Sequence, residues 1–156
     1  MTDFEALLRA LSESEVEFII VGGAAATAHG ASRLTQDLDL VYRRTAANAE
    51  RLAGALAPLH PYLREMPPGL PFRLDARTIR RGSNFTLTCS AGDIDLLGEI
   101  TGGGGYDALI KHSIQLSVFG ITCRCLDLEK LIEVKRAAGR PKDFEAIAEL
   151  EALLEE

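Results

Sequence analysis

One stretch of the chain, FIIVGGAAATAHGASRLTQDLDLVY at residues 18–42, constrains the fold more than any other. It opens within residues 16–21, VEFIIV, whose β-branched and aromatic side chains predict a buried strand. Gly22 and Gly23 follow, and then an alanine-rich segment that predicts a short helix over residues 24–29, ending at a glycine. The alternating residues 37–42 predict a second strand. A strand, a glycine turn, a short helix and another strand must therefore pack close together.

The second strand carries two acidic side chains, Asp37 and Asp39. Successive side chains of a strand point to opposite faces, so the two carboxylates share one face. Like charges this close repel each other unless a positive charge lies between them. Carboxylate oxygens suit a hard divalent cation, Mg²⁺ or Mn²⁺, and this is the first interpretation. The alternative is a solvated sheet edge, on which alternating aspartates are ordinary.

Gly22 and Gly23 lie where the buried strand gives way to the helix. Residues without a Cβ let a ligand come close to the backbone, and the first N–H groups of a helix favour phosphate. The pair therefore predicts phosphate binding, with a tight strand-to-helix turn as the alternative. Phosphate binding beside a metal site points to a metal-bridged polyphosphate as the shared ligand.

The combination of VGG at residues 21–23 with DLDL at residues 37–40 resembles the signature of the nucleotidyltransferase superfamily that includes DNA polymerase β. More narrowly, VGGAAATAHG, RLTQDLDL and the late KRAAGRPKD resemble small bacterial nucleotidyltransferase-like proteins related to abortive-infection-type toxins. The resemblance spans nearly the whole chain. It implies that Asp37 and Asp39 are catalytic and metal-binding carboxylates, and that Gly22 and Gly23 bind nucleotide phosphates.

The resemblance also implies a third carboxylate on a later strand, and GDIDLL at residues 92–97 offers Asp93 and Asp95. We prefer Asp95 because it lies between Ile94 and Leu96, whereas Asp93 stands at the entry of the strand beside a turn glycine. Residue 24 departs from the pattern of many active members, since alanine replaces a serine whose hydroxyl helps to hold the triphosphate.

Other polar residues are candidates for a role near the nucleotide. Arg33 could reach a phosphate or pair with the aspartates, and His29 ends the short helix. In the resembled group a lysine and an aspartate of the C-terminal tail approach the site. This makes Lys142 a predicted nucleotide ligand and Lys135 and Asp143 further candidates, with a solvated helix–turn–helix as the alternative.

Composition limits the partners that the chain can have. The length of 156 residues suits a single nucleotidyltransferase-like domain, residues 1–156, and the net charge of −6 argues against bulk capture of nucleic acid or an anionic membrane. No apolar run is long enough for a transmembrane helix, and the acidic N-terminus lacks a signal pattern, so we expect a cytoplasmic protein without a membrane partner. The oligomeric state is left open.

The expected architecture is an α/β (α+β) nucleotidyltransferase fold. A mixed, twisted sheet of about five strands would carry the aspartates on one edge, with helices packed on its other side and two helices at the C-terminus. Beyond residues 16–42, the patterns predict helices at 3–13, 46–57, 127–138 and 142–154, an irregular segment at 58–73, two strands within 75–100, a loop at 101–105, and a hairpin over 114–125. The first of the two strands is placed within residues 77–90.

The function that this implies is transfer of a nucleoside monophosphate from an NTP to a hydroxyl acceptor, with Mg²⁺ or Mn²⁺ as cofactor. The acceptor could be a protein, a tRNA end or a small molecule. The alternative is a non-catalytic nucleotide- or partner-binding member of a toxin–antitoxin pair. Ala24, the acidic surface and the lack of a separate substrate domain favour that alternative.

Overall fold

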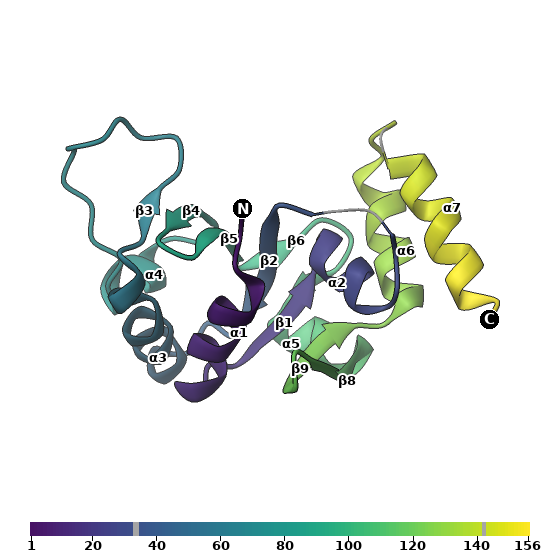
Figure 1. The fold of residues 1–156 in the computed structure, drawn as a ribbon, viewed down its shortest axis with the longest axis horizontal. Helices are drawn as coiled ribbons and strands as arrows, with labels where there is room; N and C mark the ends of the chain where they lie inside the picture. Colours follow the sequence, from purple (N-terminus) through teal and green to yellow (C-terminus); the bar gives the residue numbers. More distant parts are fainter. Residues whose placement is uncertain (33–34, 142) are drawn as a thin grey trace.

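A computed structural model describes residues 1–32, 35–141 and 143–156. Its centre is a seven-stranded mixed sheet with the strand order β3-β4-β5-β2-β1-β9-β8 (Figure 1). The strands of this sheet are β1 Phe18–Val21, β2 Asp37–Tyr42, β3 Tyr62–Leu63, β4 Phe85–Cys89, β5 Gly92–Leu97, β8 Ser113–Val118 and β9 Ile121–Leu126. A separate two-stranded sheet pairs β6 Glu99–Ile100, at the end of a predicted strand, with β7 Gly104–Gly105, which lies in the segment expected to be a loop.

The predicted mixed α+β class is confirmed, but the sheet differs from the expectation in size and in the position of its aspartates. It has seven strands instead of about five, partly because the two-residue strand β3 forms inside the proline-rich segment. β2 and β5 are parallel neighbours in the interior of the sheet, so the aspartates do not lie on an edge strand. β1 is antiparallel to β2 and parallel to β9.

Helices pack against the sheet, and the last two helices lie beside it at the C-terminal end of the chain (Figure 1). The α-helices are α1 Phe4–Glu13, α2 Gly22–Ala28, α3 Ala46–Leu56, α4 Ala76–Arg81, α5 Tyr106–Leu109, α6 Leu128–Ala138 and α7 Asp143–Leu154, with short 3-10 turns η1 Ala57–Leu59 and η2 Ile110–His112. α1 buries Leu7, Leu8 and Leu11 in the core, which also contains Leu38 and Leu40 of β2. The apolar alternation of β2 therefore anchors one face of this strand and leaves its aspartates on the other.

One helix was not predicted. Residues 76–81 form α4, and the strand placed within 77–90, with a possible break near Gly82, is confirmed as β4 but begins only at Phe85. The Asp75 carboxylate accepts a hydrogen bond from the Thr78 backbone N–H at 2.8 Å, which caps the helix, and Ile79 is buried in the core. A cap and one buried side chain outweigh the weak strand preference of this short, arginine-rich stretch.

The C-terminal helices agree with the prediction. Asp127 caps α6 by accepting from the Lys130 N–H at 2.7 Å, and Gly139 ends it with a φ of +65°. α7 begins at Asp143, one residue after the predicted start, which lies outside the described residues. None of the helices in the described part of the chain has the length and apolar composition needed to span a membrane.

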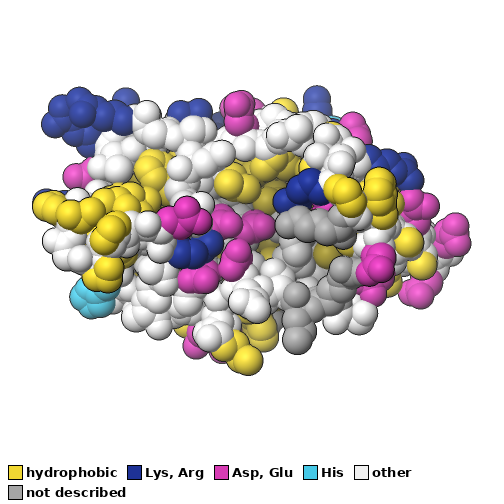
Figure 2. Space-filling view, turned by 90° about the horizontal axis from the view of Figure 1, so that it is seen from above, with side chains coloured by type: hydrophobic (Ala, Val, Ile, Leu, Met, Phe, Trp, Pro, Cys, Tyr) yellow, Lys and Arg dark blue, Asp and Glu magenta, His cyan; other side chains and the backbone are white. Residues whose placement is uncertain are grey.

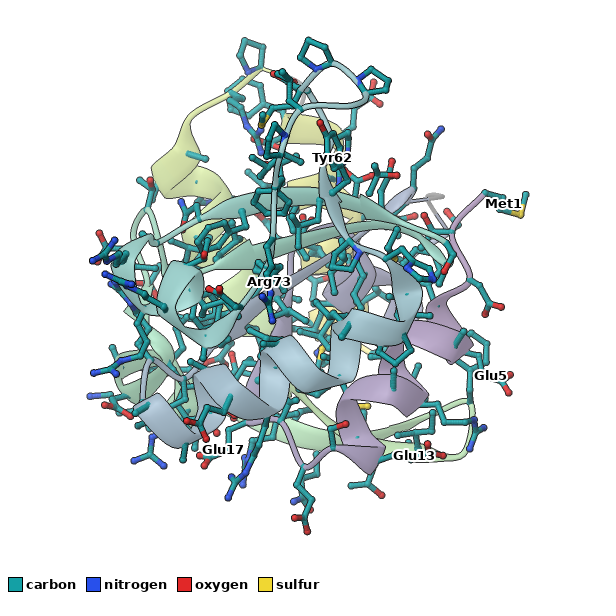
Figure 3. The ribbon with its side chains drawn as sticks, turned by 90° about the vertical axis from the view of Figure 1, so that its left-hand side faces the viewer. Met1, Glu5, Glu13, Glu17, Tyr62 and Arg73 are labelled. Atoms are coloured by element: carbon teal, nitrogen blue, oxygen red, sulfur yellow. The ribbon has the colours of Figure 1, made fainter. Side chains whose placement is uncertain are left out.

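The proline-rich segment between β3 and α4 projects from the body of the molecule (Figures 1 and 3). Its two arms are held together by Tyr62. The hydroxyl of Tyr62 lies 2.7 Å from the Pro67 carbonyl oxygen, and its ring packs edge-on against Phe72 with the centroids 6.0 Å apart. Residues 58–73, predicted to be irregular, thus have a defined base beside β4.

Candidate active site

The register between β2 and β5 brings four carboxylates together. Asp37 lies beside Asp93, and Asp39 lies beside Asp95, on adjacent parallel strands. Because side chains alternate along each strand, all four point to the same face. We call these four residues the aspartate cluster. Figure 2 views the molecule from above and shows acidic side chains gathered around a basic one in the middle of that face.

Three members of the aspartate cluster could share a metal ion. Asp37, Asp39 and Asp95 each offer a carboxylate oxygen, and these oxygens all lie within 4.8 Å of one another. Asp93 is not in this group. Its backbone N–H donates to the Thr2 hydroxyl at 3.1 Å, so the N-terminal segment holds the entry of β5 in place. The geometry thus groups Asp95, the preferred candidate, with the DLD pair.

Gly22 lies directly against Asp39 of this group, and Gly23 lies against Thr35. β1 ends at Val21, which is paired with Asp39, and α2 starts at the next residue. Gly22 has a φ of +63°, and a Cβ on it would stand 2.6 Å from the Asp39 Oδ2 atom. A Cβ on Gly23 would stand 2.8 Å from the Thr35 hydroxyl oxygen, but Gly23 does not have a positive φ. The turn therefore requires glycine at Gly22, and Gly23 is constrained by space alone.

The environment of the aspartate cluster disfavours the ionised form of two of its carboxylates. The pKa of Asp39 is raised to about 7, first by burial, then by the charge of Asp95, a hydrogen bond with Asp95 and the charge of Asp37. The pKa of Asp37 is raised as well, mainly by burial, although Arg64 opposes the shift. The Oδ1 atom of Asp39 is buried and has no hydrogen-bond partner among the described residues. A buried carboxylate oxygen without a partner is costly and favours a bound cation.

One residue beside the carboxylates, Arg64, was not predicted from the sequence. It follows β3 directly, and its Nη2 atom donates to Asp95 Oδ1 at 2.9 Å and to the Leu87 carbonyl oxygen at 2.6 Å. Its Nη1 atom lies 3.7 Å from Asp37 Oδ2, and its Nε atom lies 3.5 Å from Asp93 Oδ1. A single arginine in a proline-rich segment carries no local pattern, and only the pairing of β3 with β4 brings it to the carboxylates.

The remaining predicted residues do not join the aspartate cluster in the described structure. The His29 ring Nε2 lies 2.7 Å from the Leu126 carbonyl oxygen, so the ring is held at the end of β9. Lys135 lies 3.7 Å from the buried carboxylate of Asp143, within α6 and α7. Arg33 and Lys142, both predicted to contact phosphate, lie outside the described residues.

No family model matches the sequence, and neither does any curated protein. Solved structures do match. TM1012 of Thermotoga maritima, assigned as a nucleotidyltransferase, superposes with a TM-score of 0.58 at 14% identity, over 97% of this chain and 91% of that protein. ANT(2'')-Ia, an antibiotic-resistance factor solved in complex with adenylyl-2''-tobramycin, gives 0.56 at 16% identity, over 96% and 84% of the two chains.

An antigenic nucleotidyltransferase-like protein of Paracoccidioides brasiliensis gives a TM-score of 0.54 at 15% identity, over 97% of this chain and 77% of that one. The chain has the nucleotidyltransferase fold. The fold expected from VGG and DLDL is thereby confirmed across nearly the whole chain. At these identities the likeness establishes the architecture, and the chemistry has to be argued from the site itself.

Proposed function

We propose that the chain is a divalent-cation-dependent nucleotidyltransferase that transfers a nucleoside monophosphate from an NTP to a hydroxyl acceptor and releases pyrophosphate. The observation that carries this proposal is the group of three carboxylate oxygens, from Asp37, Asp39 and Asp95, within 4.8 Å of one another on a nucleotidyltransferase fold. Hard oxygen ligands and the buried, unsatisfied Asp39 Oδ1 atom suit Mg²⁺ or Mn²⁺.

Asp37, Asp39 and Asp95 would hold the cation, which would neutralise the triphosphate and lower the pKa of the acceptor hydroxyl. Asp95 has the additional role of accepting the proton that this hydroxyl loses as its oxygen attacks the α-phosphorus and the bond to pyrophosphate breaks. Both roles fit its position, because its side chain is 21% exposed and therefore reachable by an acceptor.

Gly22 and Gly23 are proposed to receive the nucleotide phosphates, together with Arg33 and Lys142. Gly22 lies near Asp39 and Gly23 lies near Thr35. This supports the assignment, because phosphates bound at the turn would lie next to the cation. We do not assign nucleotide contacts to Lys135, Asp143 or His29, since each is engaged by a neighbour in its own part of the fold.

The acceptor is proposed to be an alcohol on a small molecule, a tRNA end or a protein. The structure of ANT(2'')-Ia with adenylyl-2''-tobramycin is a precedent for a small molecule on this fold. A second candidate function is a nucleotide- or partner-binding member of a toxin–antitoxin pair without catalysis. Arg64 within the aspartate cluster and alanine at position 24 favour this second candidate.

The central experiment is a calorimetric titration of Mn²⁺ with and without a nonhydrolysable NTP. Binding should disappear in Asp37→Ala/Asp39→Ala and persist in the control Asp107→Ala, whose side chain is 83% exposed. Equal binding by the double variant would restore the interpretation of a solvated sheet edge.

Activity is then tested by incubating the protein with each of the four labelled NTPs, Mg²⁺ or Mn²⁺, and cell lysate. Transfer of label to any acceptor separates the enzyme from the non-catalytic candidate.

The glycine assignment has its own test. Gly23→Ala should weaken NTP binding at least about tenfold, or about 1.4 kcal/mol, because the added Cβ would stand 2.8 Å from the Thr35 hydroxyl oxygen and force a shift in the turn that is proposed to hold the phosphates. The melting temperature without ligand should fall less than in Gly22→Ala, since Gly23 has the steric contact but not a positive φ. Gly22→Ala is the comparison. It should destabilise the protein by roughly 1 kcal/mol or more, because alanine resists a φ of +63°. Full stabilisation of Gly23→Ala by Mg²⁺–NTP would place the phosphates elsewhere.

A further inference from the structure

We propose that Arg64 is the internal counter-ion of the aspartate cluster, and that a divalent cation displaces its guanidinium group when it binds. Arg64 would then lower the affinity of the site for the cation and raise the stability of the cation-free protein. This inference rests on the proposed function, because it takes the aspartate cluster to be the cation site. It adds a residue and a competition that the sequence motifs do not contain.

The contacts of Arg64 match those of a counter-ion. Its three guanidinium nitrogens face three different carboxylates: Nη2 lies 2.9 Å from Asp95, Nε lies 3.5 Å from Asp93, and Nη1 lies 3.7 Å from Asp37. The side chain is 24% exposed, so bulk water does little to screen these attractions. Among the described residues, no other cation forms an ion pair with this cluster.

The fit is nevertheless incomplete. Within the described part of the chain, one positive charge faces four carboxylates, and the Oδ1 atom of Asp39 and the Nε atom of Arg64 are both buried without a hydrogen bond. Two of the three carboxylates that Arg64 contacts, Asp37 and Asp95, also belong to the group that could hold a metal ion. A divalent cation at that group would carry twice the charge and would need the same two carboxylates. Arginine and cation therefore compete for them.

Displacement would leave the fold intact, because the backbone of Arg64 is held independently of its side chain. The Arg64 N–H donates to the Thr86 carbonyl oxygen at 3.0 Å, which continues the pairing of β3 with β4. The next residues enter the projecting proline-rich segment (Figure 3), and the Arg64 side chain is itself partly exposed. Only side-chain rotation is needed to free the carboxylates.

The experiment measures Mn²⁺ affinity by calorimetry and the melting temperature without metal, in the wild type, Arg64→Gln, Arg64→Lys and Arg44→Gln. Arg44 is the matched control, because its Nη2 atom donates to the Gly82 carbonyl oxygen at 2.9 Å and it forms no ion pair with the aspartate cluster. Arg64→Gln should bind Mn²⁺ about tenfold more tightly and melt a few degrees lower. Arg64→Lys should fall between Arg64→Gln and the wild type in affinity, because an ammonium group cannot reach three carboxylates at once. Arg44→Gln should keep the wild-type affinity.

Opposite changes in affinity and stability distinguish competition from a merely structural role, which would lower both. If the wild type binds Mn²⁺ but neither Arg64 variant binds it more tightly, the counter-ion inference is overturned while the proposed function stands. If no protein in the series binds Mn²⁺, both proposals fail together. If Arg64→Gln does not fold, Arg64→Lys decides the question, and unchanged or weaker Mn²⁺ binding by that variant overturns the inference.

Discussion

Two regions of the molecule contain partly or fully buried carboxylates, and the two differ in how these charges are balanced. Between α6 and α7, the buried carboxylate of Asp143 faces two cations, with Arg140 Nε at 2.9 Å and Lys135 Nζ at 3.7 Å. We call these three residues the helix ion group. In the aspartate cluster Arg64 pairs with three of the four carboxylates and is the one cation that does so among the described residues, and the Asp39 Oδ1 atom has no hydrogen-bond partner there.

The difference shows that burial of charge does not by itself mark a site. In the helix ion group the negative charge is fully compensated by the chain, so nothing further is needed to stabilise the carboxylate. In the aspartate cluster the described residues supply fewer positive than negative charges, and burial together with the neighbouring carboxylates raises the pKa values of Asp37 and Asp39. An excess of negative charge on neighbouring strands of a sheet is the feature that favours a bound cation.

The largest expected effect tests the compensated region. Asp143→Asn leaves Lys135, whose side chain is only 16% exposed, without its carboxylate. The loss should be about 3 kcal/mol, at the lower end of the range for a broken buried pair, because Arg140 is exposed enough to regain water. Thermal unfolding should show a decrease of roughly 10 °C, with Mn²⁺ affinity unchanged. A loss of Mn²⁺ binding at unchanged stability would mean that Asp143 belongs to the site, as the resemblance first suggested.

The same comparison explains which parts of the site could be predicted from the sequence. Asp37 and Asp39 lie two residues apart in one strand, so their shared face follows from strand geometry. The preference for Asp95 over Asp93 rested on its place inside the strand, between Ile94 and Leu96, and the structure places Asp95 in the group that could hold a metal ion. Patterns of period two and of helical period likewise gave the strands beside the glycine turn and both C-terminal helices.

Contacts between distant segments were beyond the reach of these patterns. Arg64 meets Asp95 across 31 positions of sequence, through a strand of two residues that no periodicity could reveal. The pairing of Lys135 with Asp143 depends on how two helices cross, so local charge patterns could not tell a nucleotide contact from a structural ion pair. α4 was missed because its cap, Asp75, and its single buried residue, Ile79, are weak signals over six residues.

The next effect concerns the uncompensated region and has the opposite sign. Asp39→Asn removes a carboxylate that burial and its neighbours disfavour, so the protein without metal should gain about 1 kcal/mol at neutral pH. Its melting temperature should rise by about 2–4 °C while Mn²⁺ binding is lost. A large decrease in stability would make Asp39 a structural residue and would remove the contrast with Asp143.

The pH dependence of stability sharpens this prediction. The pKa of Asp39 is about 7 in the folded protein and near 3.8 when unfolded, so between these values the folded state binds more protons. Stability of the metal-free protein should therefore fall as the pH rises from about 4 to about 7, and this decrease should level off above about 7. Between about pH 6.5 and about pH 7.5 the decrease from this group should be somewhat under ~1 kcal/mol. Asp39→Asn should lack that decrease in a series of melting curves, and a parallel decrease in both proteins would assign it to another group.

The smallest expected effect returns to the helix ion group. Arg140 donates to Asp143 at 2.9 Å, which is as short as the bond from Arg64 to Asp95, yet its side chain is 55% exposed. An exposed partner contributes little, and Lys135 would still compensate Asp143, so Arg140→Gln should cost no more than about 0.5 kcal/mol. Its Mn²⁺ affinity should equal that of the wild type, whereas Arg64→Gln should bind Mn²⁺ more tightly. Both variants remove one guanidinium at the same distance from a carboxylate, so equal Mn²⁺ affinities would mean that charge balance does not distinguish the two regions.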